Sequence, residues 1–310
     1  MARPEVNRSG EMQVFACVVD TGGFSLAARA QGMTPSAVSK LISRLEARLG
    51  AKLFDRTTRR LRLTPEGQTF YERSVRLLSD IDEAELCAAG GDAPSGRLSV
   101  HTSAAVSMHV ILPLIAGFLF RNPRVTVDVL VSDEFAGTED RRPDVIVSST
   151  PIQGSCLFKR VLCKAKMVIV ASPSYLQRCG EPKVAEELSS HNLVGSTQNS
   201  ESEGWPLIAD KGMVRIPIIG NVRASDNESL RILTIDGVGV SRLPYFVVGD
   251  DIKAGRLVEI LADCNPGDQE EIHAACPSQD GHVPIRARAF LDFLRDALRV
   301  QFGTGSPSEF

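Results

Sequence analysis

The stretch FSLAARAQGMTPSAVSKLISRLEARL, residues 24–49, predicts two short helices joined by a tight turn. Gly32 ends the first helix, because glycine readily adopts the left-handed conformation found at helix C-termini. Thr34 and Pro35 start the second helix as an N-cap oxygen followed by a proline at the first helical position. One face of this helix is apolar and consists of Val38, Leu41, Ile42, Leu45 and Leu49. The opposite face is polar and consists of Ser36, Ser39, Lys40 and Ser43. Because such a helix fits the major groove of DNA, we interpret the stretch as a helix-turn-helix whose second helix is the reader.

Basic side chains follow the predicted reader. Between residues 40 and 62 there are eight basic residues and two acidic ones, whereas the whole chain carries a net charge of −3. The basic residues are Lys40, Arg44, Arg48, Lys52, Arg56, Arg59, Arg60 and Arg62. An ordinary helical hairpin with a solvated polar face is the alternative interpretation. The charge favours DNA, because neutralising phosphates requires such a patch.

The segments beside this stretch complete a head. Residues 11–19 predict a helix with Phe15 and Val18 turned inward. Residues 51–63 predict a two-stranded wing whose tip carries arginines, which suit the narrow minor groove. A solvated basic loop is the alternative for the tip.

A long helix is predicted over residues 64–89, starting with a second Thr-Pro pair. Apolar residues recur at heptad spacing and form a seam of Phe70, Leu77, Ile81 and Ala84. At about 1.5 Å per residue the helix is roughly 40 Å long. We interpret it as a dimerisation helix, with packing onto its own body as the alternative.

Residues 90–96, GGDAPSG, predict a hinge, after which strands and helices alternate. Strands that alternate with helices over about 200 residues predict an α/β body, and this length favours two lobes over one. Residues 157–171 predict a longer strand pair, residues 214–222 and 237–240 predict strands, and residues 107–121 a helix. A capping box at 225–228 predicts a helix to about residue 236, and residues 283–300 predict a closing helix with Phe290, Leu294 and Leu298 inward.

Other classes of protein find little support. The polar start predicts no export signal, and the longest apolar run, residues 110–120, is too short to span a bilayer, so we expect a cytoplasmic protein. Seven scattered cysteines form no C-x-x-C pair, and His101, His109 and His273 lack metal-ligand spacing. We therefore expect no metal and no cofactor. No nucleophile elbow, phosphate loop or dinucleotide glycine motif indicates an enzyme.

The head, through residue 67, resembles the LysR-type transcriptional regulators very closely. The resemblance extends over about residues 10–300, through ILPLIAGFLFRNPRVTVDV, VLCKAKMVIVASPSYL, ASDNESLRILTIDGVGVSRLP and VPIRARAFLDFL. It implies a winged helix-turn-helix, a dimerising linker helix and a two-lobed body like periplasmic solute-binding proteins. The implied domains are 1–63 for DNA binding, 64–89 for the linker helix, 90–96 for the hinge and 97–310 for the effector. Lobe one would comprise about 97–170 and 270–300, and lobe two about 171–265.

The resemblance also implies functional residues. DNA contacts would come from the reader helix and the wing, with Arg59 as the likelier minor-groove contact: Thr34, Pro35, Ser36, Ser39, Lys40, Arg44, Arg56, Arg59 and Arg60. A polar or carboxylate effector would bind between the lobes at Thr102, Ser103, Ser148, Ser149, Thr150, Ser196, Thr197, Asp226, Asn227, Gly239 and Ser241. For each hydroxyl, capping a helix or ending a strand is the alternative. Residues 134–143, where the family has an apolar-patterned helix, are nearly all polar here.

The expected partners are double-stranded DNA, a small-molecule effector and further copies of the chain, as a homodimer or homotetramer, with RNA polymerase as a further candidate. Two alternatives stay open at this point. One is a redox sensor on the same scaffold, using Cys156 and Cys163. The other, from a different class, is a cytosolic solute-binding α/β protein.

Overall fold

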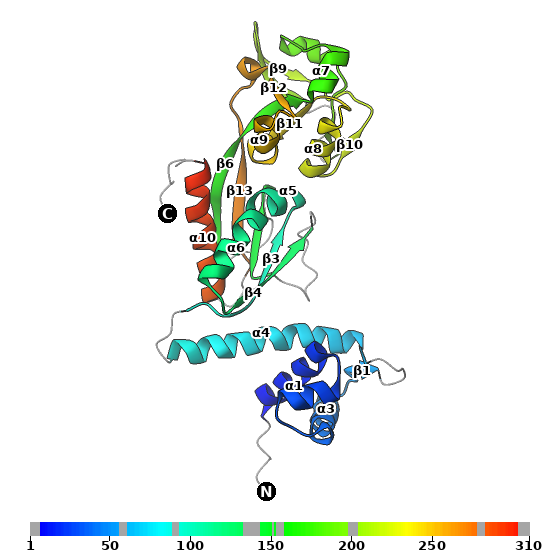
Figure 1. Ribbon diagram of the computed structural model, residues 1–310, viewed down its shortest axis with the longest axis vertical. Helices are drawn as coiled ribbons and strands as arrows, with labels where there is room; N and C mark the ends of the chain where they lie inside the picture. The colour runs from blue at the N-terminus through cyan, green and yellow to red at the C-terminus, as the bar shows by residue number, and fades with distance from the viewer. Residues whose placement is uncertain are drawn as a thin grey trace.

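The chain folds into a helical head, one long helix and a two-lobed body, stacked along one axis (Figure 1). The computed structural model describes residues 7–55, 61–88, 93–132, 143–150, 152, 158–197, 204–277 and 283–302. The arginine-bearing wing tip (56–60) and most of the polar stretch (133–142) therefore lie outside the described residues.

The head contains three helices, α1 (Arg8–Thr21), α2 (Phe24–Ala30) and α3 (Pro35–Leu49). The predicted caps of α3 are confirmed, since the Thr34 hydroxyl accepts the Ala37 N–H at 3.3 Å and Gly50 adopts the left-handed conformation. Burial of the predicted inward residues is complete for Phe15, Val18, Val38, Ile42 and Leu45, whereas Leu49 is exposed. These apolar side chains form the core of the head.

A buried carboxylate joins α3 to the wing. Glu46 accepts the Leu53 N–H at 2.9 Å and the Phe54 N–H at 3.4 Å, and Lys52 Nζ lies 3.0 Å from its other oxygen. The wing strands β1 (Phe54–Asp55) and β2 (Arg62–Leu63) pair antiparallel. Glu46 therefore fixes the point at which the chain leaves the reader helix.

Helix α4 (Pro65–Ala88) is the predicted linker helix. Its first turns pack on the head, where the rings of Phe70 and Phe15 lie 5.3 Å apart. Phe70 thus differs from the rest of the proposed seam, because it is half-buried against the core of the head. Leu77 is 49% exposed, and Ile81 and Ala84 are also exposed, so these three residues of the predicted seam are open to solvent.

The body is built on one sheet of seven strands with the order β11-β6-β13-β5-β3-β4, and β12 beside β6. In lobe one, strands β3 (Gly96–Thr102), β4 (Val125–Val131) and β5 (Val145–Ser148) are parallel neighbours. One continuous helical segment connects β3 to β4; it comprises α5 (Ala104–Val106), a π-turn η1 (Ser107–Ile111) and α6 (Leu112–Arg121). Helix α10 (Ile285–Phe302) closes lobe one, and its Phe290, Leu294 and Leu298 are fully buried, as predicted.

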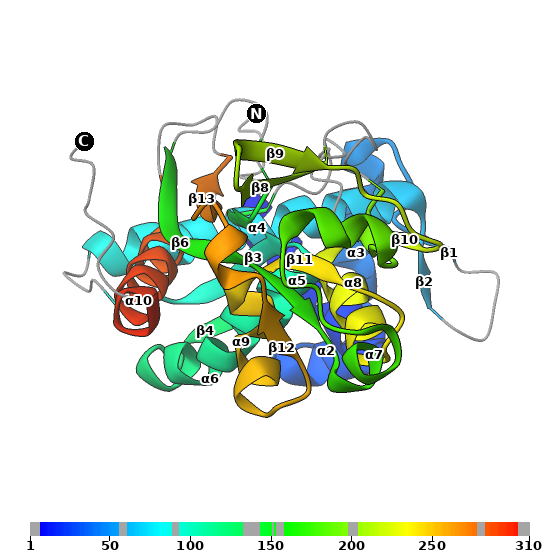
Figure 2. The same cartoon turned by 90° about the horizontal axis from the view of Figure 1, so that it is seen from above.

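Lobe two lies at the upper end of the molecule in Figure 1, and Figure 2 looks down onto it. Its elements comprise α7 (Pro173–Cys179), η2 (Ala185–Ser190), β7 (Gly195–Ser196), β8 (Trp205–Ala209), β9 (Gly212–Ile216), β10 (Arg223–Ala224), α8 (Asn227–Ile235), β11 (Ser241–Pro244), α9 (Tyr245–Lys253), β12 (Val258–Ile260) and η3 (Ala262–Cys264). Two long strands, β6 (Phe158–Ala171) and β13 (Gln269–Cys276), connect the lobes.

Several sequence predictions for the body were wrong in detail. The strand pair expected at residues 157–171 is the single strand β6, whose lower half pairs with β13 and whose upper half pairs with β11 and β12. The strand expected at 214–222 ends at Ile216, because it is the second half of the β8–β9 hairpin. Residues 237–240 contribute one bridge, Val240 to Leu193, and the strand proper follows as β11.

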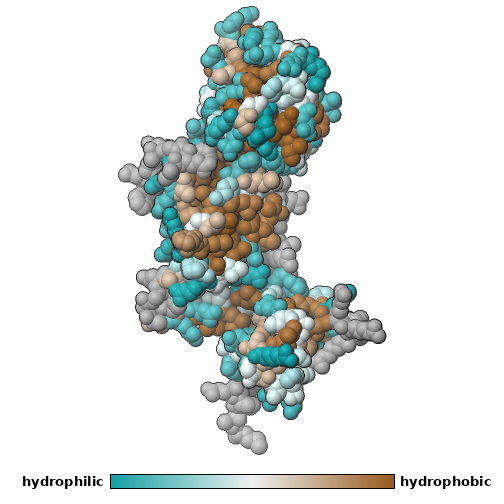
Figure 3. Space-filling model, viewed as in Figure 1, coloured by the Kyte–Doolittle hydropathy of each residue, from teal (hydrophilic) through white to brown (hydrophobic). Residues whose placement is uncertain are grey.

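The outer face of the helical segment 104–121 is apolar. Its inner face packs through Phe118, whose ring lies 5.0 Å from that of Phe290. Met108, Leu112 and Phe120 are exposed, Phe120 by 89%, and hydrophobic side chains gather over this part of lobe one in Figure 3. By length and composition alone this helix also meets the criterion for a membrane span, a test that core helices of soluble proteins pass as well.

Candidate functional site

The outward face of α3 carries the residues predicted to read DNA. Ser36, Lys40 and Arg44 are exposed, and Ser39 is half-buried beside them. The Thr34 hydroxyl is already engaged as the N-cap, and it also lies 3.1 Å from Ser36 Oγ. Arg56, Arg59 and Arg60 lie outside the described residues. A phosphate or a base edge can therefore approach α3 along its polar face without displacing core side chains.

Two of the basic residues near the reader are bound within the head. Arg48 Nη2 lies 2.7 Å from a Glu11 carboxylate oxygen on α1, and Lys52 is paired with Glu46. Burial alone would raise the pKa of Glu46, but the Leu53 and Phe54 N–H groups and Lys52 together hold it below its usual range. Glu46 is thus an ionised structural group.

A cavity of about 260 Å³ lies where the two lobes meet. Six of the residues proposed for effector binding line it, from four separate parts of the chain: Ser103, Ser149, Thr150, Ser196, Asp226 and Asn227. Asp226 is the N-cap of α8, and its Oδ1 accepts the Ser229 N–H at 2.9 Å. Parallel strand ends and helix N-termini meet here, as expected for a ligand cleft in a sheet of this kind.

The other five proposed residues are not among those lining the cavity. The Thr102, Ser148 and Ser241 side chains are buried, and Ser241 Oγ donates to the Val194 carbonyl at 3.2 Å. Thr197 donates its backbone N–H to the Ala224 carbonyl. Gly239 lies so close to the Asn192 carbonyl that an added Cβ would be 2.2 Å from its oxygen. Of these five, Ser241 is bonded to a residue that lines the cavity, Val194.

The cavity also contains two charged residues that sequence reasoning missed, Arg242 on β11 and Glu270 on β13. Arg242 donates to Asn265 Oδ1 at 3.2 Å and forms an ion pair with Asp268. Glu270 accepts hydrogen bonds from the Ser149 hydroxyl and the Asn227 amide, and its burial raises its pKa. A charged residue next to another polar one in a short strand was the available signal, but the same pattern describes a solvated face.

A second contact joins the lobes beside the cavity. His109 Nε2 on the π-turn of lobe one lies 2.7 Å from Glu228 Oε2 on α8 of lobe two. Glu228 also binds Arg231 at 2.6 Å, and Arg231 binds the buried Asp251 at 2.5 Å. The hydrogen bonds of Arg231 and Arg256 hold the pKa of Asp251 below its usual range despite its burial. This chain of charges fixes α8 relative to lobe one.

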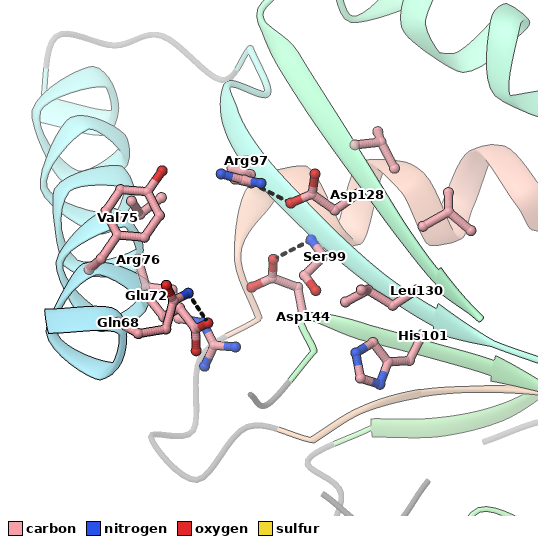
Figure 4. A pocket seen from close by; sticks show the side chains of 13 residues that line it. Gln68, Glu72, Val75, Arg76, Arg97, Ser99, His101, Asp128, Leu130 and Asp144 are labelled. Atoms are coloured by element: carbon pink, nitrogen blue, oxygen red, sulfur yellow. Dashed lines mark hydrogen bonds and ion pairs between the residues drawn. The ribbon is translucent and has the colours of Figure 1, made fainter. Parts of the chain in front are cut away.

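The linker helix meets lobe one at a pocket of about 450 Å³ (Figure 4). One wall is α4, with Gln68 donating to Glu72 at 2.7 Å, and the opposite wall is the β3–β4 edge, with the Arg97–Asp128 pair. Tyr71 on α4 donates to Asp20 of α1, and burial together with this bond raises its pKa to about 12. Head and body are thus in contact through one helix.

A buried arginine connects α4 to the body at the other end of this contact. Arg286 of α10 is 2% exposed, and its Nη2 lies 3.4 Å from both Asp80 of α4 and Asp144 of lobe one. Since burying a guanidinium without a counter-charge is costly, both carboxylates are part of the joint.

The described cysteines give little support to the redox alternative. Burial raises the pKa of Cys163 to about 12, so its side chain is a neutral thiol at physiological pH and a poor nucleophile. Cys156 lies outside the described residues. In the part of the chain that is described, no three His, Cys, Asp or Glu side chains converge to hold a metal.

These features define a class of protein in which a DNA-reading head is joined by a long helix to a two-lobed, ligand-binding body. Comparison with family models is specific: the model of the LysR substrate binding domain matches residues 91–299, and that of the bacterial regulatory helix-turn-helix protein, lysR family, matches residues 10–68. The chain belongs to the LysR family of transcriptional regulators. Regulators of this family bind DNA and small-molecule effectors and form oligomers, and they are not enzymes.

Named relatives agree with this assignment. The HTH-type transcriptional regulator CrgA of Neisseria meningitidis serogroup B is 35% identical over 291 residues, covering 94% of this chain and 97% of CrgA. The regulator PtxR of Pseudomonas aeruginosa is 33% identical over 294 residues, covering 93% of this chain and 92% of PtxR.

Solved structures resemble the whole chain as well. The structure of CrgA has a TM-score of 0.62 at 34% identity and covers 94% of this chain and 99% of that one. The full-length structure of AphB, a virulence activator of Vibrio cholerae, has a TM-score of 0.55 at 26% identity and covers 92% of this chain and 97% of AphB.

Proposed function

We propose that this regulator binds two-fold symmetric DNA sites through α3 and the wing, and that a small polar or carboxylate molecule bound between the lobes switches it. The observation that carries the proposal is the cavity between the lobes, lined from both sides by hydroxyls and strand ends. A ligand there contacts both lobes, so it binds one lobe arrangement more tightly than another and shifts the population toward it.

In this proposal Ser36, Ser39 and Lys40 contact base edges in the major groove. Pro35 lies in the same groove, and Thr34 and Arg44 contact the backbone beside it. Arg56, Arg59 and Arg60 bind DNA from the wing, with Arg59 in the minor groove. Exposure of the α3 face supports this assignment, as does the excess of basic residues from 40 to 62. Phosphate contacts position the head, and base contacts specify the site.

We further propose that residues 1–63, 64–89, 90–96 and 97–310 act as DNA-binding domain, linker helix, hinge and effector domain. A homodimer through α4 would place two heads on one site, and the exposed Leu77 and Ile81 support that seam. The apolar outer face of α6 supports a further contact, as in a homotetramer. RNA polymerase is a candidate partner at the promoter, and the cytoplasm is the expected compartment for a protein that acts on DNA.

The junction between α4 and lobe one supplies the connection between effector and DNA. Arg286 binds Asp80 on the linker helix and Asp144 in lobe one, so a shift of lobe one changes the position of α4. Because α4 carries the head, the spacing and angle of paired heads on DNA would change with it.

The experiment that tests this function is capture of genomic fragments by the purified protein, followed by footprinting with and without metabolite extract at near-physiological salt. We expect discrete sites with two-fold symmetry and a metabolite-dependent change in footprint length. The variant Lys40→Ala should lose most specific binding, whereas Lys211→Ala, an exposed lysine of the β8–β9 turn, should not. Only weak, salt-labile binding without preferred sites would refute the proposal.

A further inference from the structure

Glu270 is a half-buried carboxyl group that lines the cavity, without a counter-charge among the described residues. Its side chain accepts hydrogen bonds from the Ser149 hydroxyl and the Asn227 amide, and both of these donors are neutral. The adjacent acidic residue, Glu271, instead pairs with Lys164 at 2.7 Å on the outer side of the body. Burial of a carboxylate is costly unless an opposite charge is present. Among the described residues, Glu270 is therefore the acidic group of this cavity that lacks a cationic or helix-terminal partner.

The other charges around the cavity are already compensated. Asp226 lies at the N-terminus of α8, where it accepts the N–H of Ser229 at 2.9 Å and its hydroxyl at 2.7 Å. Arg242 forms its ion pair with Asp268 through Nη2. Among the described residues, the ion pair of Arg242 is thus with Asp268 and not with Glu270.

Two further polar atoms at the cavity lack a partner within the described part of the chain. Ser103 is 9% exposed and its hydroxyl has no hydrogen-bond partner there. The Arg242 side chain is 6% exposed, and its Nε–H likewise has none. Both residues line the cavity, and buried donors are expensive to leave unpaired, so a ligand acceptor that reaches them by a small side-chain rotation would remove this cost.

We infer that the cleft recognises a small zwitterion of the amino-acid type, with its ammonium group against Glu270 and its carboxylate against Ser103 and Arg242 Nε. The inference rests on the proposed function and adds the chemical class of the effector. It follows from what the cavity leaves unsatisfied, namely one negative charge and two donors. A simple carboxylate would satisfy the donors only, and it would leave Glu270 without a counter-charge.

The cavity walls restrict the ligand further. Met167, Val194, Trp205 and Leu230 supply apolar surface between the polar groups. At about 260 Å³ the cavity is at or below the small end of the range for ligand pockets. An amino acid with an apolar side chain fits both properties, since its side chain can pack on these walls while its charged end meets the polar groups.

The test compares each of the twenty amino acids with matched compounds that lack one charge. For an apolar amino acid these are the 2-hydroxy acid, which lacks the amine, and the decarboxylated amine. Binding to the full-length protein is measured by calorimetry, and the footprint on a captured DNA site is recorded in parallel. The informative variant is Glu270→Gln, which keeps the size and the hydrogen-bonding oxygen but removes the charge. Glu271→Gln, one position along the same strand and outside the cavity, is the matched control.

We expect at least one apolar amino acid to bind and both matched compounds to bind much more weakly. Glu270→Gln should weaken that binding by at least about thirtyfold, because it removes one partner of a buried charge pair. Glu271→Gln should change it less than about threefold, the usual limit for an exposed pair. Ser103→Ala should weaken binding of the amino acid and spare that of the decarboxylated amine.

Three outcomes would overturn the inference: the 2-hydroxy acid binds as tightly as the amino acid, Glu270→Gln leaves the affinity unchanged, or no amino acid binds. In each case the footprint separates this failure from failure of the proposed function. Discrete DNA sites that respond to metabolite extract would leave the regulator intact and its effector in another class. Glu270→Gln is expected to fold, since it keeps the size of the side chain and an oxygen that can accept the hydrogen bond of the Asn227 amide.

Discussion

Replacing Glu46 with alanine should destabilise the head by about 2–4 kcal/mol. The substitution removes the acceptor of the Leu53 N–H at 2.9 Å and of the Phe54 N–H at 3.4 Å, and both residues are buried. A buried donor left without a partner costs about 1–3 kcal/mol, and the longer bond to Phe54 contributes the smaller share. Lys52 adds little, because its side chain is 74% exposed and screened by water.

The ionised state of Glu46 also gives a pH dependence with a definite sign. The pKa in the folded head is held below the usual value of 4.5, so the unfolded chain binds the proton more readily. The carboxylate therefore contributes its stability above about pH 4.5 and loses it as the pH falls through the lower, folded pKa. The difference in stability between the wild-type protein and Glu46→Gln should shrink over that acidic window.

Urea unfolding followed by hydrogen exchange of the α1 and α3 amides measures the head by itself. Lys52→Ala is the matched control, since it removes the ion pair and leaves both backbone bonds intact. We expect a loss of less than about 1 kcal/mol for this control. The reasoning is refuted if Lys52→Ala lowers the free energy of unfolding as much as Glu46→Ala does. It is also refuted if the free energy of unfolding of Glu46→Ala lies within about 0.5 kcal/mol of the wild-type value, a change typical of an ordinary surface position.

Four further predictions concern the rest of the chain. Arg44→Ala should lower the salt dependence of DNA binding by nearly one counterion in a titration of affinity against salt, and an unchanged slope would place Arg44 off the phosphates. Arg286→Leu should destabilise the joint between α4 and the body by about 3–5 kcal/mol in thermal unfolding, whereas Arg288→Leu, at an exposed position of the same helix, should not. Equal effects of the two substitutions would exclude the ion pairs of Arg286 with Asp80 and Asp144 as the cause. Leu77→Glu should dissociate the oligomer in analytical ultracentrifugation and Asp82→Lys should not, and an oligomer that persists would move the seam elsewhere. Because its pKa is about 12, Cys163 should be alkylated at pH 8 far more slowly than the exposed Cys179, and Cys163→Ser should keep full switching; loss of switching would revive the redox alternative.

The head could be predicted almost completely from the sequence because its signals are local. Thr34 and Pro35 begin α3 through a cap and a fixed backbone angle, and Gly50 ends it. The apolar face of α3 follows from a repeat of 3.6 residues that needs no knowledge of other elements. The linker helix α4 was predictable for the same reason. The packing of Phe70 against the head was not predictable, because it depends on how α1 packs against α4.

The body was predicted less well where strand pairing decides the outcome. β6 has 14 residues, well beyond the usual strand length, and a pair of strands was therefore the natural interpretation. The strand is continuous because its two halves bind different partners, β13 below and β11 with β12 above. Glu270 was missed for a related reason, since only the pairing of β13 with β6 brings this residue to the cavity.

The buried charges of this protein lie at the boundaries between its parts. Glu46 joins the reader helix to the wing, Arg286 joins the linker helix to lobe one, and Glu228 with Arg231 and Asp251 joins lobe two to His109 of lobe one. Within the parts, apolar side chains dominate the cores. Buried ion pairs contribute little net stability compared with apolar packing, but breaking one of them is expensive. Buried ion pairs therefore fix the relative positions of neighbouring parts of the protein more precisely than apolar contacts do. A ligand that binds Glu270 between the lobes would act beside one of these joints, and we expect the same arrangement of charges to transmit the shift through α4 to the head.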